Sequence, residues 1–227
     1  LYKNIEKNDT IHTTYLQAGP ATGRISSVNP NLQNLPSDKI WGSYIKKAFC
    51  VRDEKSIFIS ADYSQIDLRV LAHFSKDERM CEAFCSGQDI HNWTARKIFS
   101  IPEERPVIET YRKIAKTVNF GVIYGMTPHG LSQSLHIPMK EAKQFIDMYF
   151  RTFPGVKNFI EKAIQDAKKN GFAITLLGRR RPIPELNSSN KNIISLGERL
   201  AVNTVIQGTS ADIIKKAMID INQSLNG

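Results

Sequence analysis

The sequence has few cysteines and no long apolar segment. Only three cysteines occur among 227 residues, a small and odd number that argues against a disulfide framework and is typical of a reducing compartment. No apolar run approaches the roughly 20 residues that span a bilayer. Internal repeats and low-complexity tracts are absent, and the hydrophobic share of 41% is ordinary for a globular protein. Membrane-spanning, fibrous and largely disordered proteins are therefore excluded.

Several catalytic signatures are missing as well. The sequence contains no P-loop, no dinucleotide-binding glycine fingerprint, no HExxH helix and no Ser-His-Asp order. It begins at Leu1 without a charged or apolar leader. We interpret it as a segment of a longer protein, so the missing leader says nothing about location.

Basic residues exceed acidic ones, but not uniformly. The chain has 31 Lys and Arg against 22 Asp and Glu, a formal charge of +9. Residues 61–120 carry nine of each sign, and the excess lies on both sides of that segment. A basic frame around an acidic spot suits a protein that holds a polyanion and a divalent cation. A solvated basic surface without a partner is the alternative.

The first third of the chain reads as loops and short strands followed by a buried strand. Residues 18–23 and 29–34 are rich in Gly, Pro and Asn, which indicates turns. Residues 56–61 (Ser-Ile-Phe-Ile-Ser-Ala) have the β-branched, apolar composition of a buried strand. A helix is predicted to begin near Gln65, because Ile66, Val70 and Phe74 recur at four-residue spacing.

Helical patterns dominate the remainder. Pro and Gly residues punctuate them at positions typical of helix ends. The predicted helices cover residues 78–86, 90–99, 107–124, 128–135, 139–152, 156–170, 191–206 and 209–224. Residues 173–184 predict a short hairpin with Gly178 in its turn.

Asp62 follows the predicted strand and precedes the predicted helix. A carboxylate at the rim of a sheet is held by a rigid backbone, which suits a metal ligand. Mg²⁺ commonly takes one or two protein carboxylates and fills its other positions with water and substrate phosphates. The alternative is that Asp62 caps the following helix.

The helix predicted over residues 107–124 carries an unusual stripe. At roughly 100° per residue, Arg112, Lys116 and Phe120 lie on one face, and Tyr124 lies one turn further along. Two cations followed by two aromatics match the phosphates, sugar and base of a nucleoside triphosphate. In an ordinary amphipathic helix, charges and aromatics would separate onto opposite faces.

Other features are weaker. Cys81 and Cys85, with His73 and His91 nearby in sequence, allow a zinc site, although ordinary packing is the more economical interpretation. Residues 178–182 form a compact basic turn, and residues 207–212 predict a turn with a polar entry between two helices.

Taken together, these segments resemble the polymerase module of family A DNA polymerases, the DNA polymerase I group. Residues 62–69 (Asp-Tyr-Ser-Gln-Ile-Asp-Leu-Arg) resemble motif A, and residues 112–125 resemble motif B on the O helix of the fingers. Further similar segments are residues 21–24, 31–34, 89–91, 178–181 and 207–209, which occur in family order across nearly the whole chain.

The resemblance implies a helix-rich α+β fold of the polymerase right-hand type, with a partial antiparallel palm sheet. It implies palm at residues 1–76, fingers at 77–198 and a second part of the palm at 199–227. The implied activity is template-directed addition of dNMP to a primer 3′-hydroxyl by two-metal phosphoryl transfer. The implied partners are primer-template DNA and dNTPs, with no membrane, for a monomer in the bacterial cytoplasm or a DNA-containing organelle.

The resemblance also implies residue roles. Asp62 would bind both Mg²⁺ ions, with the Tyr63 carbonyl assisting. The triphosphate would be held by Arg112, Lys116 and His91, with Gln65 nearby. Phe120 would pack on the incoming sugar and discriminate against dideoxynucleotides, and Tyr124 would occupy the template-base position in the open state. Residues implied at the DNA are Arg24 and Gln207, which would read minor-groove acceptors, and Asn31, Asn34, Arg199 and Asn203, which would line the cleft.

The chain departs from the family pattern in two ways. The expected motif C, a His-Asp-Glu hairpin after the last helix, and the thumb do not occur in it, and Asp212 and Asp220 are poor substitutes for the missing carboxylate. We therefore expect the activity to belong to a longer parent enzyme. In addition, Asp67 stands where the family usually has the glutamate that excludes ribonucleotides by crowding the ribose 2′ position. Aspartate is one methylene shorter, so we expect its carboxylate to lie slightly further from the sugar and ribonucleotide exclusion to be somewhat weaker.

The sequence leaves two other functions open. A phage-type single-subunit RNA polymerase shares the superfold, but the acidic residue at Asp67 and the Asn119-Phe120 pair disfavour it. A non-catalytic DNA-binding module would retain the cleft without the chemistry.

Overall fold

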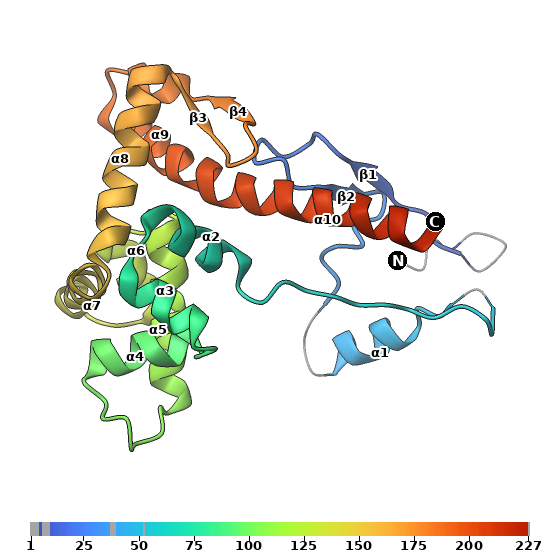
Figure 1. Cartoon of the computed structure of the whole chain (residues 1–227), viewed down its shortest axis with the longest axis horizontal. Helices are drawn as coiled ribbons and strands as arrows, with labels where there is room; N and C mark the ends of the chain where they lie inside the picture. Colours follow the sequence, from blue (N-terminus) through green and yellow to red (C-terminus); the bar gives the residue numbers. More distant parts are fainter. Residues whose placement is uncertain (1–4, 6–9, 37–39, 52, 227) are drawn as a thin grey trace. The chain divides into compact units, whose positions relative to one another are not determined.

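The computed structural model describes residue 5 and residues 10–36, 40–51 and 53–226, with the chain order shown in Figure 1. The chain divides into two compact units, Leu1–Ser64 and Gln65–Gly227. We call them the N-terminal unit and the helical unit. The helix-rich α+β fold predicted from the sequence is confirmed: helices dominate, and the strands form two small antiparallel pairs.

The N-terminal unit contains one hairpin and one short helix. Strands β1 (Thr14–Leu16) and β2 (Ser26–Val28) pair antiparallel with Thr14 opposite Val28. The buried Ser27 accepts a hydrogen bond from the Leu32 backbone N–H at 2.9 Å, which ties the following turn to the hairpin. Helix α1 spans Trp41–Lys47. The turns and short strands predicted for this region are confirmed.

The prediction of a buried strand over residues 56–61 is wrong for this structure. The segment has no regular secondary structure, and Ile57, Phe58 and Ile59 are 79%, 69% and 74% exposed. Composition makes a segment suitable for a sheet, but a strand forms only where neighbouring strands take up its backbone N–H and C=O groups. No other described strand pairs with this segment.

Most of the predicted helices form in the helical unit, several at the expected residues. The helices are α2 (Ile66–Ser75), α3 (Glu78–Cys85), α4 (Ile90–Phe99), α5 (Glu109–Ile123), α6 (Pro128–Leu135), α7 (Met139–Thr152), α8 (Pro154–Asn170), α9 (Lys191–Asn203) and α10 (Thr209–Asn226). The predicted hairpin consists of β3 (Phe172–Ile174) and β4 (Arg180–Pro182), and a 3₁₀ turn spans Pro184–Asn187. Gly178 lies in the hairpin turn with a φ of +90°, a conformation that only glycine adopts without strain.

Between α9 and α10 the chain does not turn, contrary to prediction. Residues Thr204–Gly208 form a π-helical segment that joins the two helices continuously. A π segment inserts extra backbone without leaving the helix, so backbone hydrogen bonds are kept while the faces of the two helices shift. Residues 207–212 are therefore helical.

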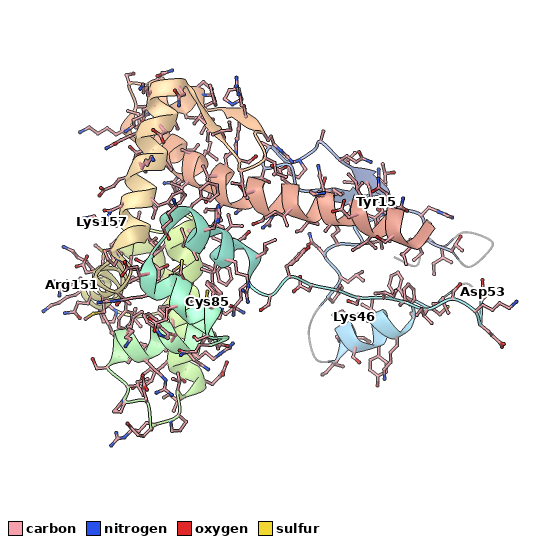
Figure 2. The ribbon with its side chains drawn as sticks, in the orientation of Figure 1. Tyr15, Lys46, Asp53, Cys85, Arg151 and Lys157 are labelled. Atoms are coloured by element: carbon pink, nitrogen blue, oxygen red, sulfur yellow. The ribbon has the colours of Figure 1, made fainter. Side chains whose placement is uncertain are left out.

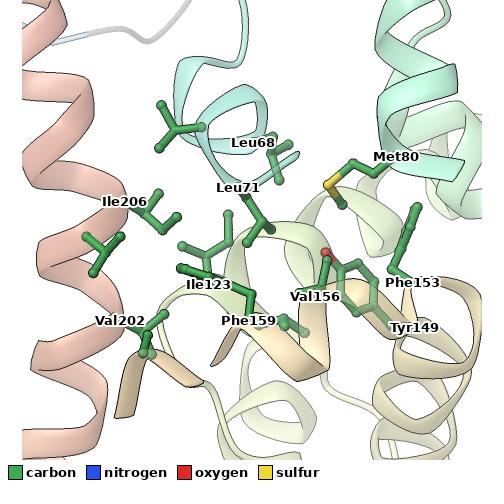
Figure 3. Close-up of a cluster of buried hydrophobic side chains, with 14 of the residues drawn as sticks. Leu68, Leu71, Met80, Ile123, Tyr149, Phe153, Val156, Phe159, Val202 and Ile206 are labelled. Carbon is green, nitrogen blue, oxygen red and sulfur yellow. The ribbon is translucent and has the colours of Figure 1, made fainter. Parts of the chain in front are cut away.

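The core lies entirely in the helical unit. Figure 3 shows Leu68 and Leu71 of α2 among side chains from α3, α5, α7, α8 and the π segment. Every buried hydrophobic side chain of the described residues lies after residue 65. At the corner between α7 and α8, buried Asp77 caps α3 and accepts the Gly155 backbone N–H at 2.8 Å. Asp77 thereby joins the start of α3 to the start of α8.

The surface carries charged side chains and free cysteines. In Figure 2, Arg151 and Lys157 project outward at the ends of α7 and α8. The cysteines are all unpaired thiols, and within the described part of the chain no three His, Cys, Asp or Glu side chains form a metal-binding group. Among the same residues, no helix is long and apolar enough to cross a bilayer.

Candidate nucleotide-binding and catalytic site

Helix α5 presents the predicted mixed stripe. Arg112 and Lys116 lie along its first half, and Phe120 and Tyr124 follow at its end, with ring centroids 6.4 Å apart and planes inclined by 16°. The other face is buried and consists mainly of small and β-branched residues. Helix α5 therefore buries one face, and its other face carries two cations followed by two half-buried, stacked aromatic rings.

Arg112 is paired with a carboxylate of α4. Its Nη2 donates to Asp89 Oδ2 at 2.8 Å, and both side chains are about one third exposed. The other oxygen of Asp89 accepts the backbone N–H groups of His91 and Asn92, which caps α4. Burial alone would raise the pKa of the Asp89 carboxyl, but the hydrogen bonds from Arg112 and the two N–H groups hold it below its usual value.

His91 lies under α5 with 3% of its surface exposed. The Thr94 hydroxyl donates to Asn119 Oδ1, and Asn119 Nδ2 donates to His91 Nδ1 at 3.0 Å. Burial, assisted by the positive charges of Arg112 and Lys116, lowers the pKa of His91 to about 4. The imidazole is therefore neutral near pH 7, with its proton on Nε2, and it lies 5.7 Å from the Phe120 ring, centroid to centroid.

Asp67, on the first turn of α2, connects three helices. It is 6% exposed, its Oδ2 accepts the Tyr124 hydroxyl at 3.1 Å, and its Oδ1 accepts the Ser210 hydroxyl at 2.6 Å. Gln65, at the N-cap of α2, is half-buried and adopts a φ of +56°. The structure thus brings Asp67 of motif A to Tyr124 of motif B.

Asp62 and Tyr63 belong to the N-terminal unit and are both exposed. Asp62 does not cap α2, because the N-cap of that helix is Gln65. An exposed carboxylate with an adjacent backbone carbonyl fits a Mg²⁺ ion that keeps most of its waters or takes phosphate oxygens.

The other two candidate carboxylates, Asp212 and Asp220, have partners in the helical unit. Asp212 is buried and accepts hydrogen bonds from the Thr175 hydroxyl and from Arg179. On α10, the Oδ2 atom of Asp220 lies 3.0 Å from the Nζ atom of Lys216. Both carboxylates therefore have hydroxyl or cationic partners within the helical unit.

The predicted DNA-binding residues fall into two groups. Arg24, Asn31 and Asn34 are exposed in the N-terminal unit, where Asn31 Oδ1 accepts the backbone N–H of Asn34 at 3.2 Å. Arg199, Asn203 and Gln207 are half-buried on α9 and the π segment.

Arg199 contacts a glycine of α5's C-terminal turn, and Asn203 has a buried oxygen without a described partner. Arg199 packs on Gly125, where a β-carbon would lie 2.5 Å from Arg199 Cγ, and both residues line a cavity of about 160 Å³. The Oδ1 atom of Asn203 is buried and has no hydrogen-bond partner among the described residues. An unpaired buried acceptor is costly unless a ligand or water completes it.

Three polar contacts of this region are not predicted by the sequence. Asp89 belongs to a family-like segment, but no sequence pattern shows that it pairs with Arg112. Asn119 could have been found, because it is a polar residue on the otherwise apolar face of α5. Ser210 gave no sequence signal, since its contact with Asp67 joins residues 143 positions apart.

Comparisons with known proteins find relatives that match nearly the whole chain. The model of the family described as DNA polymerase family A matches residues 1–227. DNA polymerase I of Streptococcus pneumoniae (serotype 4) is 50% identical over 215 residues, which cover 95% of this chain and 24% of that protein. DNA polymerase I of Bacillus subtilis is 51% identical over 215 residues, again 95% of this chain and 24% of that protein.

A solved structure is also similar. The POL domain of Pol1 from M. smegmatis, in complex with DNA primer-template and dNTP, superposes with a TM-score of 0.91 at 40% identity, covering 99% of this chain and 40% of that one. The chain spans about a quarter of the length of the curated relatives it matches. With the family model matched over all of its residues, the chain belongs to DNA polymerase family A.

Proposed function

We propose that the protein catalyses template-directed DNA synthesis, adding dNMP from a dNTP to a primer 3′-hydroxyl. The observation that carries the proposal is one face of α5, on which half-buried Arg112 and exposed Lys116 precede the half-buried, stacked rings of Phe120 and Tyr124. A nucleoside triphosphate has the same order of charge and apolar surface. Family membership and the similar structure with primer-template and dNTP support the proposal.

The phosphate end would be held by three side chains. Arg112 and Lys116 supply positive charge that offsets the charge developing on the β and γ phosphates. His91 is neutral near pH 7 and supplies an Nε2–H donor, which adds a directed hydrogen bond without a further charge. Arg112 would exchange Asp89 for phosphate when the nucleotide binds.

The sugar and base end would be shaped by α2 and the end of α5. Phe120 would pack on the sugar, Asp67 would crowd the ribose 2′ position, and Gln65 would lie near the phosphates. Tyr124 would occupy the template-base position in the open state. Because the Tyr124 hydroxyl donates to Asp67, movement of the end of α5 would change the contacts of the Asp67 carboxylate.

Asp62 and the Tyr63 carbonyl are the proposed ligands for magnesium, on which family A polymerases generally depend. When bound, the ions lower the pKa of the primer 3′-hydroxyl and neutralise the departing pyrophosphate. Asp62 is exposed, whereas Asp212 and Asp220 are paired, which supports Asp62 over those two residues as the ligand. A second carboxylate, on motif C, would come from outside these 227 residues.

The remaining proposed contacts are to primer-template DNA. Arg24 and Gln207 would read minor-groove acceptors, which checks pair geometry rather than sequence, and Asn31, Asn34, Arg199 and Asn203 would line the cleft. We assign residues 1–76 and 199–227 to the palm and residues 77–198 to the fingers. The protein would act as a monomer in the bacterial cytoplasm or in a DNA-containing organelle.

Primer extension by the Asp62→Ala variant of the longer parent enzyme, which would supply motif C, tests this function. Loss of a metal carboxylate removes several kcal/mol of transition-state stabilisation, so we expect extension to fall on the order of 10³-fold or more. Glu54→Ala is the matched control, because it removes an exposed carboxylate of the same unit. We expect both variants to bind primed DNA as the wild type does, with an affinity that falls as salt rises.

Two outcomes would contradict the proposal. Extension by Asp62→Ala at the wild-type rate would remove Asp62 from the chemistry. Salt-sensitive DNA binding by a wild-type protein that does not extend a primer with Mg²⁺ and dNTPs would instead indicate a non-catalytic DNA-binding module.

A further inference from the structure

Asp67 is held by two hydroxyl groups from different helices. The Ser210 hydroxyl donates to Oδ1 at 2.6 Å and the Tyr124 hydroxyl donates to Oδ2 at 3.1 Å. Ser210 is 1% exposed and Asp67 is 6% exposed, so water does not compete freely for the contact between them. A length of 2.6 Å is typical of a strong hydrogen bond from a hydroxyl to a carboxylate.

The Ser210 hydroxyl has one proton and two acceptors within reach. Its second acceptor is the Ile206 carbonyl oxygen, four residues earlier, at 3.1 Å. This is the ordinary local bond of a helical serine. The shorter distance to Asp67 indicates that the proton points to the carboxylate. The adjoining π segment sets which face of α10 meets α2, and so places Ser210 opposite Asp67.

The two donors differ in how firmly they are held. Ser210 lies on the first turn of α10, and its neighbours Ala211 in the same turn and Ile206 in the π segment are also buried. Tyr124 is only half-buried, at the C-cap of α5, where its ring stacks on Phe120 and packs against the edge of the core. Ser210 therefore offers a fixed anchor, and Tyr124 offers a contact at the end of a helix.

We propose that Ser210 is a positioning residue for sugar selection, because it fixes the carboxylate of Asp67 through Oδ1. The inference rests on the proposed function, in which Asp67 crowds the ribose 2′ position. Aspartate is one methylene shorter than glutamate, so a small rotation moves its carboxylate away from the sugar. The hydroxyl of Ser210 blocks that rotation and keeps the short side chain effective.

The test is a double-mutant cycle in the longer parent enzyme, with kcat/KM measured for a dNTP and for the matching rNTP. A hydrogen bond to a charged group is worth enough to change the dNTP-to-rNTP selectivity of Ser210→Ala roughly tenfold, downward. In the Asp67→Ala background, which has no carboxylate to position, Ser210→Ala should leave selectivity unchanged. A ratio of two substrates is insensitive to the fraction of folded enzyme, so destabilisation alone would not move it.

Ser132→Ala is the matched control. Ser132 also donates a 2.6 Å hydrogen bond, to the Ile137 carbonyl, in α6 and away from Asp67. We expect it to leave selectivity at the wild-type value. Ser210→Thr retains the hydroxyl and should keep selectivity near wild type, which provides a second readout if Ser210→Ala does not fold.

Unchanged or higher selectivity in Ser210→Ala would overturn the inference, as would an equal loss in the Asp67→Ala background. Either result would leave the proposed function intact, because the wild type would still extend primers with dNTPs. A wild-type protein that incorporates neither nucleotide would overturn the proposed function and this inference with it.

Discussion

His91 lies beneath α5, 3% exposed, with Asn119 donating to its Nδ1 and with two cations nearby. Its pKa is lowered from 6.5 to about 4, first by burial and then by the charges of Arg112 and Lys116. A protonated imidazole would face those charges and lose its acceptor at Nδ1. The structure therefore keeps this side chain as a neutral donor across the physiological pH range.

This shift predicts a pH-dependent stability. The unfolded chain binds a proton at His91 below about pH 6.5, whereas the folded chain does so only below about pH 4, so stability rises with pH between these values. On lowering the pH from 7.5 to 5, this group alone should cost about 2 kcal/mol of unfolding free energy. Urea unfolding at both pH values should show a smaller loss for His91→Gln. Equal losses in the two proteins would contradict the assignment.

At the scale of elements, Asp89 links the start of α4 to the first half of α5. One carboxylate oxygen caps α4, and the other accepts from Arg112. An arginine held in this way is ordered before any nucleotide binds, but the carboxylate competes with phosphate for it. The same ion pair therefore positions the phosphate-binding cation and weakens its first contact with a triphosphate.

Asp89→Asn separates these two effects. Asparagine caps a helix as well as aspartate does, so α4 should keep its stability within about 0.5 kcal/mol. Loss of the negative charge should tighten binding of dNTP to the protein–DNA complex severalfold, as measured by equilibrium fluorescence titration. Glu109→Gln is the matched control, because Glu109 is 83% exposed and lies 3.9 Å from Arg112. Weaker binding by Asp89→Asn would show that ordering of Arg112 matters more than competition.

At the scale of the whole molecule, the two units differ in what stabilises them. All buried hydrophobic side chains of the described residues lie in the helical unit, and the N-terminal unit has a two-stranded hairpin and a seven-residue helix. An isolated hairpin and a short helix are marginally stable in water. We infer that the helical unit is the cooperative folding unit of the chain.

Removal of residues 1–64 tests this inference. The truncated protein, residues 65–227, keeps the complete core cluster and should unfold in one cooperative thermal transition, with a midpoint within about 5 °C of the full chain. Circular dichroism at 222 nm would follow the transition. A broad, non-cooperative loss of signal would show that the N-terminal unit contributes to the core. Its counterpart, residues 1–64 alone, should show no cooperative transition.

Local patterns predicted the helical unit well. The bounds of α4, α6 and α7 match the predicted residues 90–99, 128–135 and 139–152, because caps, prolines and apolar periodicity are encoded within a few residues. The stripe on α5 was predicted for the same reason. The strand at 56–61 was predicted wrongly, since its pairing depends on other strands, and the π segment was missed because its signal is a change of register rather than of composition.

The sequence by itself determined the family, the helices and the residue types on α5, because motif order, helix caps and periodicity are properties of neighbouring residues. Only the tertiary structure decided which polar groups meet. It paired Arg112 with Asp89, buried His91 against Asn119, and placed Ser210 and Tyr124 on the two oxygens of Asp67. These contacts join residues 23 to 143 positions apart, and they arise from helix packing that no local pattern encodes.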